Sequence, residues 1–157
     1  MDKIYKNEIT DFLIKILDTS DLISYNLVDF EDDDINFIVS PKLTSLKVKD
    51  KDKLKFILYC SGINVITIYC PTLYNLTDKD SVMYTLDVIN NVNAKIAIGK
   101  IYLNNNNSSV ISYINRILFN DIFKELSTDL LENYINSYLA TSVEFYKLIK
   151  EGKSVIW

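Results

Sequence analysis

Histidine is absent from the 157 residues of this chain. Its absence removes the commonest general base and the commonest metal ligand of proteins. Cysteine is scarce: only Cys60 and Cys70 occur, whereas a zinc site made of cysteine alone needs about four thiolates. Two cysteines are also too few for a disulfide framework. The composition therefore predicts neither a bound metal nor a cofactor.

Glycine is nearly as rare, and Gly62, Gly99 and Gly152 stand far apart. A phosphate-binding loop needs closely spaced glycines, so none is predicted. No G-x-S-x-G or S-x-x-K motif stands in a context that would support a nucleophile. We therefore expect a protein that is not an enzyme. An enzyme that uses only carboxylates and lysines, or an accessory structural protein, stays open as an alternative.

The chain is acidic, with a net charge of −4 and a pI of about 4.8. It therefore lacks the dominant basic face of most nucleic-acid-binding proteins, and we expect no nucleic-acid partner. One lysine-rich stretch is diluted by Asp50 and Asp52. Such lysines protect an exposed sheet edge, which is the interpretation favoured for this stretch. Its lysines are Lys42, Lys47, Lys49, Lys51, Lys53 and Lys55.

The stretch from Phe56 to Thr77 carries no charge and is long enough to span a bilayer. However, Ser61-Gly62 in its middle is a turn signal, and Pro71 would break a helix. Its β-branched and aromatic residues favour a buried β-hairpin over a membrane helix. The N-terminus has no basic segment followed by an apolar one. We therefore expect a cytoplasmic protein without a membrane partner.

Apolar periodicity and turn signals predict a single α+β domain over residues 1–157. We expect a mostly antiparallel sheet of five to six strands with three helices, because neighbouring strands are joined by short turns. Gly99, inside one expected strand, indicates a bulge or a close backbone approach. The elements are expected in the order α-β-β-β-β-α-β-β-α, at residues 2–18, 25–30, 35–39, 54–60, 63–70, 79–93, 95–103, 109–117 and 127–150.

Acidic residues gather between the first two expected strands. Asp29, Glu31 and Asp33 alternate as in a calcium loop, but the glycine and the final glutamate of such a loop are missing. A solvated turn is therefore favoured, and no metal is expected. A carboxylate pair for acid–base catalysis among Asp29, Glu31 and Asp34 is the alternative.

The central hairpin is apolar on both faces. A two-residue turn at Ser61-Gly62 would place Cys60 opposite Ile63 and set the two cysteines on opposite faces, too far apart for a disulfide. In this register one face carries Ile57, Tyr59, Ile66 and Ile68. If a helix covers that face, it belongs to the core. If the face is open, it is a binding site for a protein partner or for a second copy in a homodimer.

A resemblance to a known family follows from two segments. Residues 86–93, Leu-Asp-Val-Ile-Asn-Asn-Val-Asn, precede Ile98-Gly99-Lys100-Ile101-Tyr102-Leu103. This helix end followed by a glycine-containing strand resembles the YbjN family, although Ile98 stands where an aromatic residue is common. The resemblance implies a type III secretion chaperone-like fold and a non-enzymatic role as a protein-binding module or regulator, with no catalytic residues.

Overall fold

The computed structural model describes residues 3–28, 34–42, 54–61 and 64–155. Within these ranges the chain forms one six-stranded antiparallel sheet, in the order β1-β2-β3-β4-β6-β5, and four helices. The predicted α+β class and element order are confirmed, with α3 as an additional short helix. The elements are α1 (Lys3–Thr19), β1 (Ile23–Val28), β2 (Ile35–Pro41), β3 (Phe56–Ser61), β4 (Val65–Asn75), α2 (Val82–Lys95), β5 (Lys100–Leu103), β6 (Val110–Leu118), α3 (Ile122–Glu125) and α4 (Thr128–Val155).

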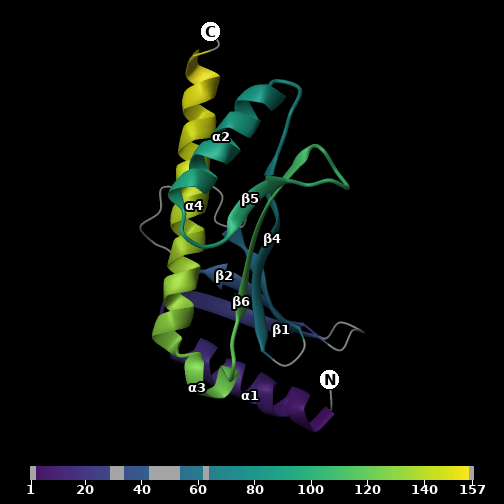
Figure 1. Cartoon of the computed structure of the whole chain (residues 1–157), viewed down its shortest axis with the longest axis vertical. Helices are drawn as coiled ribbons and strands as arrows, with labels where there is room; N and C mark the ends of the chain where they lie inside the picture. The colour runs from purple at the N-terminus through teal and green to yellow at the C-terminus, as the bar shows by residue number, and fades with distance from the viewer. Residues whose placement is uncertain (1–2, 29–33, 43–53, 62–63, 156–157) are drawn as a thin grey trace.

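The helices lie on one side of the sheet. Figure 1 shows α2 and α4 side by side against the same face, with α1 and α3 at the end of the sheet where β6 runs into α3. In the described ranges no helix covers the other face. None of the described helices has the length and apolar character needed to cross a membrane. The charge-free stretch instead contributes β3 and β4, as predicted.

Helix α4 is held over the middle of the sheet by Tyr138. Its ring centroid lies 5.1 Å from that of Phe56 and 4.9 Å from that of Tyr113. Its hydroxyl donates a hydrogen bond to the Leu54 carbonyl at 3.1 Å. Burial raises the pKa of Tyr138 far above its usual range. This side chain therefore stays neutral and joins the long helix to strands from both halves of the sheet.

Helix α2 begins later than the sequence predicts. The helix was expected from residue 79, but Ser81 is its N-cap and accepts a hydrogen bond from the Tyr84 N–H. The buried positions of α2 are Thr85, Val88, Ile89 and Val92, whereas Val82 and Leu86 are exposed. The half-buried Tyr84 donates a hydrogen bond from its hydroxyl to the Leu148 carbonyl of α4 at 2.8 Å.

The register of the central hairpin differs from the predicted one. Cys60 pairs with Ile66 and Ser61 with Val65, so residues 62–64 connect the strands in place of a two-residue turn. An odd shift moves every side chain of one strand to the opposite face. The helix-covered face consequently takes Phe56, Leu58 and Cys60 from β3, and Ile66, Ile68 and Cys70 from β4.

Two expectations are therefore wrong. Ile66 and Ile68 are 0% exposed in the core, so they do not share a surface with Ile57 and Tyr59. The two cysteines face the same side of the sheet and not opposite sides. Even so, Cys60 lies opposite Ile66 whereas Cys70 lies opposite Tyr113 on the next strand. Both thiols are buried, and neither forms a disulfide.

Candidate binding face and cavity

The uncovered side of the sheet is here called the open face, and the strand pairing defines it. Its first row runs across five strands, because Ile57 pairs with Ile38 and Tyr69, and Ile114 pairs with Tyr69 and Lys100. Side chains in such a row are cross-strand neighbours. The open face comprises Ile38, Ile57, Tyr69, Ile114 and Lys100 in the first row, and Asn36, Tyr59, Thr67 and Arg116 in the second.

Apolar side chains on the open face are accessible. Ile38 is 36% exposed, and Leu118, near the end of β6, is 80% exposed. Ile57, Tyr69 and Ile114 are half-buried. In a sheet with helices on one side only, the other face is normally polar. Here the centre of that face is apolar and aromatic.

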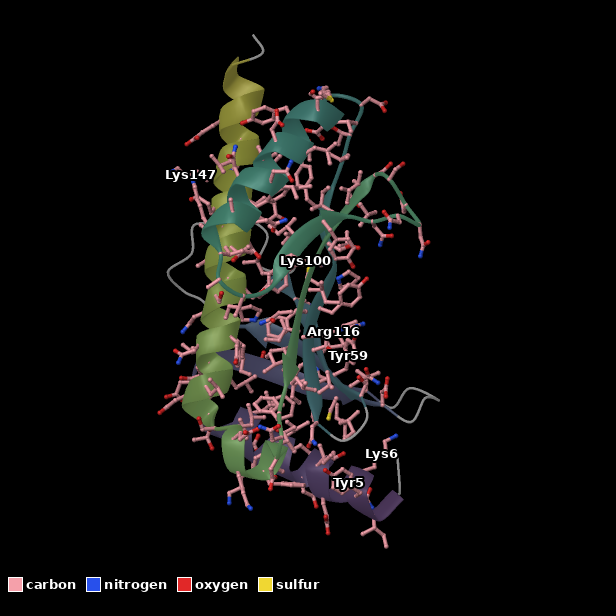
Figure 2. All side chains as sticks on the ribbon, in the orientation of Figure 1. Tyr5, Lys6, Tyr59, Lys100, Arg116 and Lys147 are labelled. Atoms are coloured by element: carbon pink, nitrogen blue, oxygen red, sulfur yellow. The ribbon has the colours of Figure 1, made fainter. Side chains whose placement is uncertain are left out.

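The second row places a small residue between two long ones. Thr67 pairs with Tyr59 on one side and with Arg116 on the other. Figure 2 shows Tyr59 and Arg116 close to each other on the side of the sheet away from α4. Thr67 is 0% exposed, and its hydroxyl has no hydrogen-bond partner among the described residues. This row therefore holds a polar group that is covered and unsatisfied.

A cavity of about 650 Å³ opens on the β5–β6 side of the open face. That volume is within the usual range for small-ligand pockets. Lys100 and Tyr102 lie two residues apart on β5, and Ile114 and Arg116 lie two residues apart on β6, so all four point to the open face. The lining residues are Gly99, Lys100, Tyr102, Asn105, Ile114, Asn115 and Arg116.

The cavity carries positive charge that pairs with no acidic side chain among the residues the structure describes. Lys100 and Arg116 are exposed and form no ion pair within the described ranges, in contrast to Lys95 with Glu144 and Lys124 with Asp121. Moreover, none of the six strands contains Asp or Glu. The cavity is therefore a basic site on an acidic protein.

Two features fix the β5 wall of the cavity. The Asn93 side chain of α2 donates a hydrogen bond to the Ile101 carbonyl at 2.8 Å and accepts one from the Ile101 N–H at 2.9 Å. Gly99 enters β5 with a positive φ of 74° and lies against Tyr113. The sequence predicted a bulge or a close backbone approach within a strand, but Gly99 precedes β5 and its close neighbour is the Tyr113 side chain. Together these contacts hold Lys100, which stands between Gly99 and Ile101.

Tyrosines extend the site along the open face. Burial raises the pKa of Tyr69, and the neighbouring Tyr102 hydroxyl adds to this effect. Ser112, opposite Tyr102, donates a hydrogen bond to the Pro71 carbonyl at 2.7 Å. Tyr69 is thus a neutral polar group beside an apolar floor, able to donate or accept a hydrogen bond.

Of the four predicted interface residues, Ile57 and Tyr59 lie on the open face and the other two do not. Lys100, Tyr102 and Arg116 were not predicted from the sequence. Two signals pointed to Arg116: it is the sole arginine, and it interrupts an otherwise uncharged strand. The calcium candidates Asp29, Glu31 and Asp33 lie outside the described residues, as does most of the lysine-rich stretch. Of the carboxylates considered for catalysis, Asp34 is the described one, and it is half-buried. Among the residues that are described, no acidic or sulfur side chains cluster closely enough to hold a metal ion.

Comparisons with known proteins give a fold and no function. No family model and no curated protein matches the chain. A similar solved structure is the crystal structure of an uncharacterized protein from Methanothermobacter thermautotrophicus. It is 17% identical with a TM-score of 0.60, and the match covers 90% of this chain and 96% of that one. At this identity the likeness shows a shared fold alone, and membership of the YbjN family stays a prediction from the sequence.

Proposed function

We propose that this protein is a non-enzymatic binding module whose open face receives a segment of a partner protein. The observation that carries the proposal is the row from Ile38 through Ile57 and Tyr69 to Ile114, which crosses four strands without a described helix over it. Contiguous apolar surface on a folded protein commonly marks a binding site. The resemblance to the YbjN family points in the same direction.

The charges of the open face favour a partner that carries carboxylates. Lys100 and Arg116 stand at the β5–β6 end of the apolar row, with no acidic side chain on any strand. Complementary charge across an interface fixes the register of the partner and excludes partners of the wrong sign. An acidic group next to an apolar one is therefore the pattern that this face selects.

A second copy of the chain fits this face less well. A symmetric dimer sets the same patch of both subunits against each other. Because the strands supply two cations and no carboxylate, the facing strands of such a dimer would offer Lys100 and Arg116 no opposite charge. A different, acidic protein is accordingly favoured over the homodimer, and the experiment separates the two.

Site-directed photo-crosslinking in the cell of origin tests the proposal. p-Benzoylphenylalanine replaces Tyr59 on the open face, and a control replaces Phe123, which is 39% exposed on α3. We expect position 59 to crosslink one defined protein, which is then identified, and position 123 not to do so. Crosslinking to a second copy of the chain, together with a dimer mass by light scattering, would show that the open face forms a homodimer and does not bind an acidic partner protein.

The identified partner is then measured against purified variants. Ile57→Asp places a carboxylate on the open face, whereas Val82→Asp makes the same change at a position on α2 that is 53% exposed. We expect the first to weaken binding at least about tenfold and the second to leave it unchanged, because only the first buries an unpaired charge in the interface. Equal affinities of the two variants would refute the open face as the binding surface.

A further inference from the structure

The cavity differs from the rest of the open face because it combines cationic side chains with an apolar one. Ile114 pairs with Lys100 and stands two residues before Arg116 on the same strand, so it adjoins both cations. An anion held by both cations has this isoleucine beside it. The cavity therefore selects a group in which a negative charge and an apolar surface are immediate neighbours.

We infer that the cavity receives the C-terminal carboxylate of the partner together with an apolar last side chain. The inference rests on the proposed function and names the part of the partner that is recognised. In a C-terminal residue the side chain branches from the carbon that carries the carboxylate, so both can enter together. In Asp or Glu the carboxylate ends the side chain, with no apolar group beyond it. A cavity of about 650 Å³ has room for a whole residue and not merely for a carboxylate.

The lining supplies donors suited to this group. The Arg116 guanidinium matches a carboxylate with two parallel N–H donors, and Lys100 adds a compact charge from the neighbouring strand. Asn115 also lines the cavity, but it pairs with Ile68, so its side chain is buried on the helix-covered face and does not point into the cavity. Tyr102 and Asn105 complete the polar lining and are available to the last peptide group of the ligand.

The inference is tested with small probes and the intact protein, by amide chemical shifts in NMR titrations. The probe is N-acetyl-L-phenylalanine, which has a carboxylate beside an aromatic side chain. N-acetyl-L-phenylalaninamide is the uncharged analogue of this probe. N-acetyl-L-glutamic acid α-amide has a carboxylate at the end of its side chain only. We expect saturable shifts at Lys100, Ile114 and Arg116 for the first probe, with affinity about tenfold lower for the other two. Equal binding of all three would overturn the inference.

Inorganic phosphate is the third comparison. It brings charge without an apolar body, so we expect it to bind more weakly than N-acetyl-L-phenylalanine and to compete poorly with it. Phosphate that binds as tightly, at the same residues, would show a general anion site and overturn the assignment of a C-terminal residue.

Variants assign the effect to the cavity. Arg116→Gln should lower the affinity for N-acetyl-L-phenylalanine about tenfold. Arg116→Lys should retain part of this affinity, because it keeps the charge without the bidentate geometry. The control is Lys147→Gln, which removes one exposed positive charge from α4. Figure 2 shows Lys147 on the side of the sheet opposite to Arg116. Equal affinities of Arg116→Gln and Lys147→Gln for the probe would overturn the inference.

The partner protein separates this inference from the proposed function. Amidation or removal of its last residue should weaken its binding about tenfold if the cavity holds the C-terminal carboxylate. If Ile57→Asp abolishes partner binding while the altered C-terminus has no effect, the proposed function stands and the C-terminal assignment fails. The probe titrations need no partner, so they decide the chemistry of the cavity even if the open face binds none.

Discussion

Gly99 lies directly against the ring of Tyr113. A Cβ added to Gly99 would be 2.2 Å from the Tyr113 hydroxyl oxygen and 2.6 Å from its Cζ, and the φ of Gly99 is +74°. Gly99→Ala therefore meets both a steric overlap and a backbone conformation that disfavours side chains. We expect it to lower the free energy of unfolding by about 2–4 kcal/mol, measured in urea, as the sum of these two effects. A change below about 0.5 kcal/mol would show that β5 moves away freely.

Tyr113 itself gives a prediction of the opposite sign. Its side chain is 0% exposed, and its hydroxyl has no hydrogen-bond partner among the described residues. Tyr113→Phe removes this unsatisfied group and keeps the ring contact with Tyr138. We expect the variant to be more stable by about 1 kcal/mol in thermal or urea unfolding, because the desolvation cost of the hydroxyl disappears. A loss of stability would reveal a partner for the hydroxyl.

The two faces of the hairpin are distinguished by a matched pair of substitutions. Ile68→Ala opens a cavity in the core and should cost about 2–5 kcal/mol. Ile57→Ala, at a half-buried position on the open face, should cost about 1 kcal/mol or less. Urea unfolding of both variants checks the assignment. Equal losses would mean that something covers the open face in the free protein.

This pair also shows where prediction from sequence stops. The apolar spacing of residues 2–18 predicted a helix, and α1 spans Lys3–Thr19, because helix periodicity is local. The hairpin faces were not predictable in this way, because the length of the turn after Ser61 decides them and one residue more or less exchanges the faces. The cavity depends on the same pairing. Lys100 and Arg116 come from different strands, and only the register of β5 on β6 brings them to one place.

The buried thiol of Cys60 should make stability depend on alkaline pH. Burial, with a smaller effect from the Asp34 charge, raises its pKa from 9.0 to about 11. The folded state therefore holds the proton more tightly than the unfolded state. The resulting stabilisation is complete below pH 9 and disappears as the pH rises towards 11. The shift corresponds to about 2–3 kcal/mol.

Cys60→Ala isolates this effect, because other groups titrate equally in both proteins. Urea unfolding at pH 8 and pH 11 should show that the stability advantage of the unsubstituted protein over Cys60→Ala shrinks by about 2–3 kcal/mol. A constant difference across this range would contradict the assignment of the pH dependence to Cys60.

Asn93 acts as a substitute for a neighbouring strand at the edge of the sheet. Its amide satisfies both the N–H and the carbonyl of Ile101, while Ile101 faces Tyr113 on its other side. Asn93→Ala leaves both backbone groups without these partners, so we expect a loss of about 2 kcal/mol. Amide hydrogen exchange should also become faster at Ile101, because β5 is a four-residue edge strand and loses these two hydrogen bonds.

The control is Asn91→Ala, an exposed position on the same helix, which should change neither quantity. Lys100 precedes Ile101, so a looser β5 should also weaken N-acetyl-L-phenylalanine binding several-fold, with Asn91→Ala unaffected. This effect requires that the rigid position of Lys100, and not its charge alone, contributes to affinity. If Asn93→Ala is destabilised yet binds the probe as tightly as Asn91→Ala, then Arg116 alone would hold the anion. In that case Lys100→Gln should also leave the affinity for N-acetyl-L-phenylalanine unchanged.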